Sequence, residues 1–118
     1  MSVLFLWYPK CSTCQKAKKW LDDNHIAYEA RDIKTDRPSV EELKIWHEKS
    51  GLELKRFFNT SGQLYRSMNL KDKLPEMAKE QQLELLATDG MLVKRPLLIT
   101  EDTVLAGFRE PAYAQALR

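Results

Sequence analysis

The hydrophobic positions at the start of the chain change from a continuous run to a helical spacing. Residues 3–8 are apolar throughout and are followed by Pro9, a pattern typical of a strand buried on both faces. Residues 13–24 then carry apolar side chains at helical spacing, with Thr13 as the expected N-cap. Alternating apolar and polar residues over 26–33 predict a second strand. A helical crossover of this length predicts that the two strands are parallel.

The middle of the chain has a helical pattern that is repeatedly interrupted. Ser39 and Glu42 have the spacing of a capping box, and the helix that they begin is expected to end at Gly51. Three shorter helical segments follow, separated by turn-forming residues, at 54–58, 65–70 and 77–86. The region of about residues 39–92 is therefore predicted to be a set of short packed helices.

The last part of the chain returns to a strand pattern. Residues 97–100 and 103–106 are predicted strands that flank a tight turn at Glu101-Asp102. Residues 110–118 are a predicted closing helix. Because no repeat or low-complexity tract divides the sequence, we expect one α/β domain over residues 1–118, with the helical region inserted between two pairs of strands.

The composition limits the classes of partner. With 118 residues, 43% of them hydrophobic, the chain has the size of one domain and enough apolar residues for a core. A net charge of +2 is too balanced to indicate a nucleic-acid surface. The apolar run at residues 3–8 is too short to span a membrane and lacks the flanks of a signal peptide. We therefore expect a cytoplasmic protein with no membrane contact and no direct nucleic-acid contact.

The two cysteines, Cys11 and Cys14, lie between the first predicted strand and the helix that follows. A thiol at the start of a helix faces unpaired backbone N–H groups and the positive end of the helix dipole, and both favour the thiolate. No acidic residue occurs before Asp22, so the local field also favours a thiolate or a bound oxyanion. The basic residues that create this field are Lys10, Lys16, Lys18 and Lys19.

The spacing of the cysteines predicts redox chemistry. Two intervening residues allow Cys11 to attack as a nucleophile and Cys14 to resolve the mixed disulfide, as in a thioredoxin-like motif. A zinc site is disfavoured because no second cysteine pair exists and His25 and His47 do not form a spaced ligand pair. Apolar filler and a permanent structural disulfide are weaker alternatives, since the surroundings are polar and a short loop removes little unfolded-state entropy.

Five short sequence motifs, the first of which contains the cysteine pair, occur in one order along the chain. They are YPKCSTC at residues 8–14, FFNTSG at 57–62, KDKLP at 71–75, VKRP at 93–96 and GFR at 107–109. Together they resemble the arsenate reductase/Spx family, and most of all its short bacterial arsenate reductase-like (Spx/MgsR-like) members. The resemblance implies a thioredoxin-like (glutaredoxin-like) α/β fold with a small mixed sheet, a helical insertion between the second and third strands, and an active thiol at Cys11.

The arsenate reductases of this family place three arginines around the oxyanion and use glutathione to resolve the intermediate. Arg95 matches one of these arginines directly, Arg109 matches another after a one-residue shift, and the third falls on Asn59. An amide cannot replace the charge and the bidentate fork of a guanidinium, which argues against arsenate as the substrate. The resemblance nevertheless implies a thiol and anion site made of Cys11, Cys14 and these residues, with Lys10 beside it.

The proline at position 96 follows Arg95 at the start of the third predicted strand. In thioredoxin-like folds a proline at this position faces the cysteine pair and has a cis peptide bond. A trans bond is the more common state of a proline taken by itself, but the family resemblance favours cis at Pro96. Such a bond would turn the backbone next to Arg95 toward the thiols and could hold a substrate disulfide.

Two functions stay open at this stage. We favour a thiol–disulfide or thiol–oxyanion oxidoreductase without a bound cofactor or metal, monomeric, that takes electrons from glutathione with glutaredoxin or from thioredoxin. The alternative is an Spx-like regulator, in which oxidation of the cysteine pair alters binding to the C-terminal domain of the RNA polymerase α subunit. Gly51 lies near the segment that resembles the polymerase-contacting region, although a glycine there also serves to end a helix.

Overall fold

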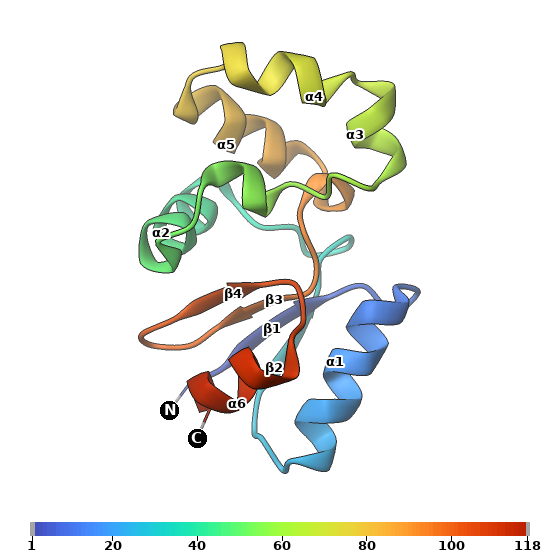
Figure 1. Cartoon of the computed structure of the whole chain (residues 1–118), viewed down its shortest axis with the longest axis vertical. Helices are drawn as coiled ribbons and strands as arrows, with labels where there is room; N and C mark the ends of the chain where they lie inside the picture. The colour runs from blue at the N-terminus through green and yellow to red at the C-terminus, as the bar shows by residue number, and fades with distance from the viewer. Residues whose placement is uncertain (1, 118) are drawn as a thin grey trace.

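The fold is built on one mixed sheet of four strands, as seen in a computed structural model that describes residues 2–117 (Figure 1). The sheet has the order β2-β1-β3-β4. The bounds of the strands are Leu4–Trp7 for β1, Glu29–Asp32 for β2, Leu97–Ile99 for β3 and Val104–Ala106 for β4. β1 and β2 are parallel, and the other two pairs are antiparallel. The parallel first pair and the terminal hairpin predicted from the sequence are therefore confirmed.

Both faces of the sheet are covered, which explains the continuous apolar run in β1. Alternate residues of a strand point to opposite faces. Phe5 joins a buried cluster with Leu21 of α1 (Ser12–Asp23) and Tyr113 of α6 (Glu110–Leu117). Leu6 joins the larger cluster formed with the helical insertion. Arg118, which the sequence placed in the last helix, and Met1 lie outside the described residues.

The helices between β2 and β3 form the insertion, which occupies the upper half of Figure 1. It consists of α2 (Val40–Ser50), η1 (Leu54–Phe57), α3 (Gln63–Ser67), α4 (Leu70–Lys73), η2 (Leu74–Glu76), α5 (Lys79–Thr88) and η3 (Gly90–Leu92). The predicted capping box is present: the Ser39 hydroxyl accepts from the Glu42 N–H, and the Glu42 carboxylate accepts from the Ser39 N–H, each at 3.1 Å. Gly51 ends α2 with a left-handed φ of 69°.

Several element bounds predicted from the sequence are wrong. The single segment expected at 65–70 is instead two helices, α3 and α4, separated by Asn69 with a left-handed φ of 54°, and the helix expected at 77–86 is α5, Lys79–Thr88. The N-cap of α1 is Cys11 rather than Thr13, because Cys11 is still extended while its carbonyl already accepts from the Gln15 N–H. The second strand begins at Glu29 rather than at residue 26. The N–H of Ile26 bonds back to the last turn of α1, so the chain is still closing the helix there and reaches β1 only at Glu29.

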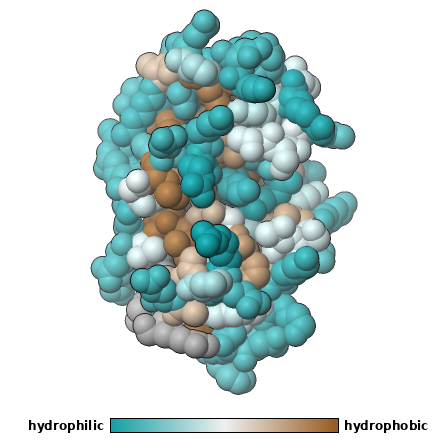
Figure 2. Space-filling model, in the orientation of Figure 1, coloured by the Kyte–Doolittle hydropathy of each residue, from teal (hydrophilic) through white to brown (hydrophobic). Residues whose placement is uncertain are grey.

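The surface in the same view is mainly hydrophilic (Figure 2). Hydrophobic surface is concentrated in a band along the left and centre of this face. Within residues 2–117, no helix combines the length and the apolar character that crossing a membrane requires.

Candidate active site

Both cysteines are held at the point where β1 ends and α1 begins. Cys11 is half-buried, its N–H donates to the Tyr8 carbonyl at 3.0 Å, and it is the N-cap of the helix. Cys14 is buried, with 0% of its surface exposed, and its sulfur accepts from the Tyr8 N–H at 3.5 Å. Both thiols are free. One backbone turn therefore brings an accessible thiol and a buried thiol together.

The environment of Cys11 favours its thiolate. Partial burial, the largest single influence, raises the pKa of the Cys11 thiol, whereas hydrogen bonds from the backbone and side chain of Cys14 and from the backbone of Thr13 lower it. The positive charge of Arg95 acts in the same direction as these hydrogen bonds, so the net pKa of Cys11 lies below its ordinary value. The unpaired N–H groups of the first turn of α1 are the physical source of the backbone contribution.

The environment of Cys14 has the opposite effect. Burial raises the pKa of Cys14 to about 12, and the neighbouring Cys11 adds to this rise. The N–H of Tyr8 and the charge of Arg95 oppose it without cancelling it. Cys14 therefore stays a thiol at neutral pH, whereas Cys11 is the thiol that is both ionised more easily and reachable from solvent.

Arg95 is the cation that the tertiary structure brings to the thiols. It follows η3 and precedes β3, and the peptide bond between Arg95 and Pro96 is cis, as the resemblance implied. The guanidinium carbon lies 5.4 Å from the centroid of the Tyr8 ring, a cation–π distance worth about 0.5–2 kcal/mol. Nη1 donates to the Met91 carbonyl at 3.4 Å, and the buried Nε has no hydrogen-bond partner among the described residues.

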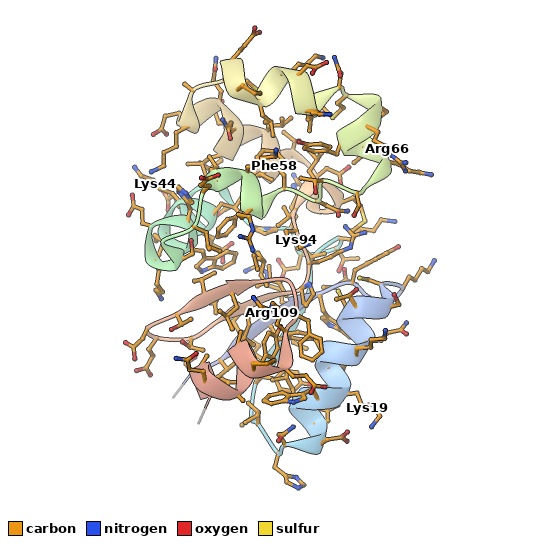
Figure 3. The ribbon with its side chains drawn as sticks, in the orientation of Figure 1. Lys19, Lys44, Phe58, Arg66, Lys94 and Arg109 are labelled. Carbon is orange, nitrogen blue, oxygen red and sulfur yellow. The ribbon has the colours of Figure 1, made fainter. Side chains whose placement is uncertain are left out.

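The other predicted anion-binding residues are not joined to the thiols in residues 2–117 by any hydrogen bond or ion pair. Lys10 is exposed. Arg109 is exposed between β4 and α6, in front of the sheet in Figure 3. Asn59 lies in a turn, where its side-chain oxygen accepts from the Ser61 hydroxyl at 3.4 Å. Their roles in binding an anion stay predictions.

The sequence analysis gave Tyr8 no role in the site, although it named Tyr8 as the last residue of the first strand and the first residue of the YPKCSTC motif. Its backbone contacts both cysteines and its ring lies under Arg95. Its position at the end of a buried strand, just before the Pro-Lys-Cys turn, is the only sequence signal for this role. A second missed residue is Tyr113 of α6, whose pKa is raised by burial and by the charge of Cys14.

One hollow of the insertion is separate from the thiols. A cavity of about 260 Å³ lies among η1, α4 and η2 and is lined by Leu54, Tyr65 and Leu74, with Lys55 and Lys71 at its polar parts. No cluster of three or more His, Cys, Asp or Glu side chains that could hold a metal ion occurs in the described part of the chain.

Comparison with known proteins places this site in a family. The model of the ArsC family matches residues 6–116. The chain belongs to the ArsC family. The match includes both cysteines, Arg95 and the whole helical insertion.

Relatives of this ArsC-family chain include an uncharacterised protein and a transcriptional regulator. The chain is 54% identical to "Uncharacterized protein YusI" of Bacillus subtilis over 115 residues, which cover 98% of each chain. It is 30% identical to "Global transcriptional regulator Spx" of Enterococcus faecalis over 104 residues, covering 86% of this chain and 76% of the relative. The solved structure of a putative ArsC family related protein from Bacteroides fragilis is 57% identical, with a TM-score of 0.95 over 100% of this chain and 98% of that one. The thioredoxin-like fold with an inserted helical region, expected from the sequence, is thereby confirmed.

Proposed function

We propose that this ArsC-family protein is a thiol–disulfide or thiol–oxyanion oxidoreductase, with Cys11 as the nucleophile and Cys14 as the resolving thiol. The observation that carries the proposal is the contrast between two thiols at one helix start. Cys11 is half-exposed and has a lowered pKa, while Cys14 is buried and has a pKa of about 12. This difference allows the Cys11 sulfur to attack the substrate first and the Cys14 sulfur to attack the resulting mixed disulfide afterwards.

The reaction with a disulfide proceeds in two displacements. The Cys11 thiolate attacks one sulfur of the substrate, a new S–S bond forms, and the other substrate sulfur leaves as a thiolate that takes up a proton. Cys14 then loses its proton and attacks the Cys11 sulfur, which expels the second substrate sulfur as a thiolate. The substrate gains two electrons, and the protein is left with a Cys11–Cys14 disulfide.

The order of the two steps follows from electrostatics. Before the first step, the Cys11 thiolate adds to the rise in the pKa of Cys14. Once Cys11 is part of a mixed disulfide its negative charge is gone, while Arg95 and the Tyr8 N–H still favour the Cys14 thiolate. Cys14 therefore becomes easier to deprotonate when its attack is needed. Glutathione with glutaredoxin, or thioredoxin, would return the two electrons.

A disulfide fits this site better than arsenate does. Among the described residues, Arg95 is the one arginine whose charge acts on the thiols. Asn59 occupies the position at which the arsenate reductases of this family have a third arginine. Arsenate carries several negative oxygens that need more than one fixed cation. The thiol–oxyanion form of the activity therefore depends on help from Arg109 or Lys10.

Alkylation of the protein with iodoacetamide across pH tests the nucleophile. We expect adducts on Cys11 at lower pH than for a free cysteine, and almost none on Cys14, because only Cys11 combines exposure with a lowered pKa. In Cys14→Ser, mixed disulfides should accumulate on Cys11, whereas Cys11→Ser should form none. Equal labelling of both thiols with the pH dependence of free cysteine would reject the assignment.

A redox-switched regulator is the second candidate. It is favoured by the 30% identity to a protein named as a global transcriptional regulator. The Cys11 and Cys14 pair could serve either as the active thiols of an oxidoreductase or as the redox switch of a regulator. The family resemblance gives the C-terminal domain of the RNA polymerase α subunit as the partner. Capture of that domain by the protein in its reduced and oxidised forms tests this function. Binding that depends on oxidation, together with no turnover of disulfide or arsenate, would favour the regulator over the oxidoreductase.

A further inference from the structure

Tyr8 touches the thiol site in three separate ways. Its carbonyl accepts from the Cys11 N–H at 3.0 Å, its N–H donates to the Cys14 sulfur at 3.5 Å, and its ring lies 5.4 Å from the guanidinium carbon of Arg95. The first two contacts belong to the backbone and do not need a tyrosine. The third belongs to the side chain alone.

Arg95 has little else to fix its guanidinium. Its Nη1 makes one long hydrogen bond, of 3.4 Å, to the Met91 carbonyl, and its buried Nε has no hydrogen-bond partner in residues 2–117. No described carboxylate forms an ion pair with it. An arginine side chain has many rotamers, so a weakly anchored one spends part of its time away from any single neighbour. The face of the Tyr8 ring is the surface that restricts it here.

We propose that Tyr8 is a positioning residue of the thiol site, whose ring holds the Arg95 guanidinium beside Cys11 and Cys14. The inference rests on the proposed function of the cysteine pair. The ring does not touch the substrate, and it acts only through Arg95. Removing the ring should therefore have the same kind of effect as removing the guanidinium, and a smaller one.

The pH profile of Cys11 alkylation measures this effect. Arg95→Gln should move the profile to higher pH, because the positive charge that favours the thiolate is lost. Tyr8→Leu should move it in the same direction and slow alkylation at neutral pH by roughly threefold. Tyr8→Phe keeps the ring and should restore the wild-type profile. In an Arg95→Gln background, Tyr8→Leu should have no additional effect.

The neighbouring residue gives a matched control. Trp7 also has a cation over its ring, the Lys18 ammonium at 5.7 Å from the centroid, but this pair does not involve Arg95. Trp7→Leu therefore removes an aromatic ring and a cation–π contact one position away. We expect it to leave the alkylation profile of Cys11 unchanged. A shift equal to that of Tyr8→Leu would mean that loss of any ring at this strand end is enough, and would overturn the proposal.

The remaining outcomes distinguish the role of Tyr8 from the proposed function of the cysteine pair. A wild-type profile in Tyr8→Leu, with a shifted profile in Arg95→Gln, overturns the role of Tyr8 and leaves the proposed function intact. An equal shift by Tyr8→Leu with and without Arg95 overturns it as well. A wild-type Cys11 that titrates like a free cysteine counts against the proposed function itself.

One measurement needs no substitution and covers the case in which Tyr8→Leu does not fold. The NMR signals of the Arg95 side chain in the wild-type protein should be shifted upfield by the ring current of Tyr8. Arg95 signals at ordinary positions would overturn the proposal.

Discussion

Two cysteines three positions apart in one helix have opposite chemical character. Cys11 caps α1 and is partly exposed, while Cys14, within the first turn, is directed into the protein and has 0% exposure. Burial costs a charged group its hydration, so it acts against the Cys14 thiolate more strongly than the nearby N–H and Arg95 act in its favour. The asymmetry follows from which side of the helix start each sulfur occupies.

The raised pKa of Cys14 predicts a loss of stability at alkaline pH. Its pKa rises from 9.0 to about 12 on folding, so above pH 9 the unfolded chain loses a proton that the folded chain keeps. The stabilisation is complete below the unfolded pKa and is lost as the pH rises toward the folded one. In reducing buffer, the free energy of unfolding should fall with pH more steeply in the wild type than in Cys14→Ala, by up to about 1.4 kcal/mol per pH unit.

Urea denaturation between about pH 8 and about pH 11 measures both slopes. The comparison of slopes cancels the contribution of the lysines and of most tyrosines, which both proteins share. Parallel pH profiles for the wild type and Cys14→Ala would contradict the burial of an un-ionised thiol at position 14.

A short pairing between separate segments positions the far side of the site. Phe58 and Val93 form an isolated antiparallel bridge. Flanking it, the Lys94 N–H donates to the Phe57 carbonyl and the Asn59 N–H to the Leu92 carbonyl, each at 2.8 Å. The turn that carries Asn59 is thereby fixed against the segment that leads into Arg95.

This pairing makes Asn59 the position at which to test for a reduced arsenate site. Asn59→Arg should raise the protection of Cys11 from alkylation by arsenate or phosphate about tenfold, because a charge-assisted hydrogen bond contributes about 1.5–3 kcal/mol. Asn59→Gln, which keeps the amide, is the control and should give the wild-type level. No gain of protection in Asn59→Arg would show that this turn does not face an anion held at Cys11.

At the scale of the whole molecule, the site lies where two hydrophobic clusters meet at one strand. Phe5 belongs to the cluster beneath α1 and α6, and Leu6 and Tyr8 belong to the cluster beneath the insertion. α1 supplies the thiols, and the chain returning from the insertion supplies Arg95. Any change in how the insertion packs on the sheet is therefore expected to move the cation relative to the sulfurs.

The charge around Cys11 predicts a preference for anionic substrates. Lys10 and Lys16 are exposed and form no ion pair in the described residues, whereas Lys18 and Lys19 are paired with Asp22 and Asp23. The reaction of Cys11 with a negatively charged disulfide should slow as salt is added, because exposed charges are screened beyond about 10 Å at 0.1 M ionic strength. The reaction with a neutral disulfide should change little.

A pair of variants with equal net charge isolates this effect. Lys10→Gln together with Lys16→Gln should weaken the salt dependence, since both side chains lie beside the thiols in the sequence. Replacing Lys71 and Lys79 of the insertion by glutamine removes the same charge elsewhere and should leave the salt dependence as it is. The salt dependence is measured by stopped-flow rates of the reaction with the negatively charged disulfide at several salt concentrations. If both double variants weaken the salt dependence equally, a local field from Lys10 and Lys16 is contradicted.

Short-range patterns in the sequence determined much of the fold and the position of the two thiols. The strand before Pro9, the capping box at Ser39, the turn at Glu101-Asp102 and the cysteine pair at a helix start all follow from residues within a few positions of one another. Predicted element boundaries were wrong where a local hydrogen bond that the hydrophobic pattern does not reveal determines the backbone conformation. The first strand residue after α1 is Glu29 because Ile26 is still bonded to the helix end.

Only the tertiary structure decided which charged residues reach the thiols. Arg95 and Tyr8 meet although most of the chain separates them, whereas Arg109, which the resemblance placed in the same set, is exposed beyond β4 without a hydrogen bond or ion pair to either thiol in the described residues. The burial of Cys14 likewise depends on side chains contributed by other elements. Spacing along the chain fixes which residues share a helix turn, but contacts between distant segments fix burial and charge, and these set the chemistry of the two sulfurs.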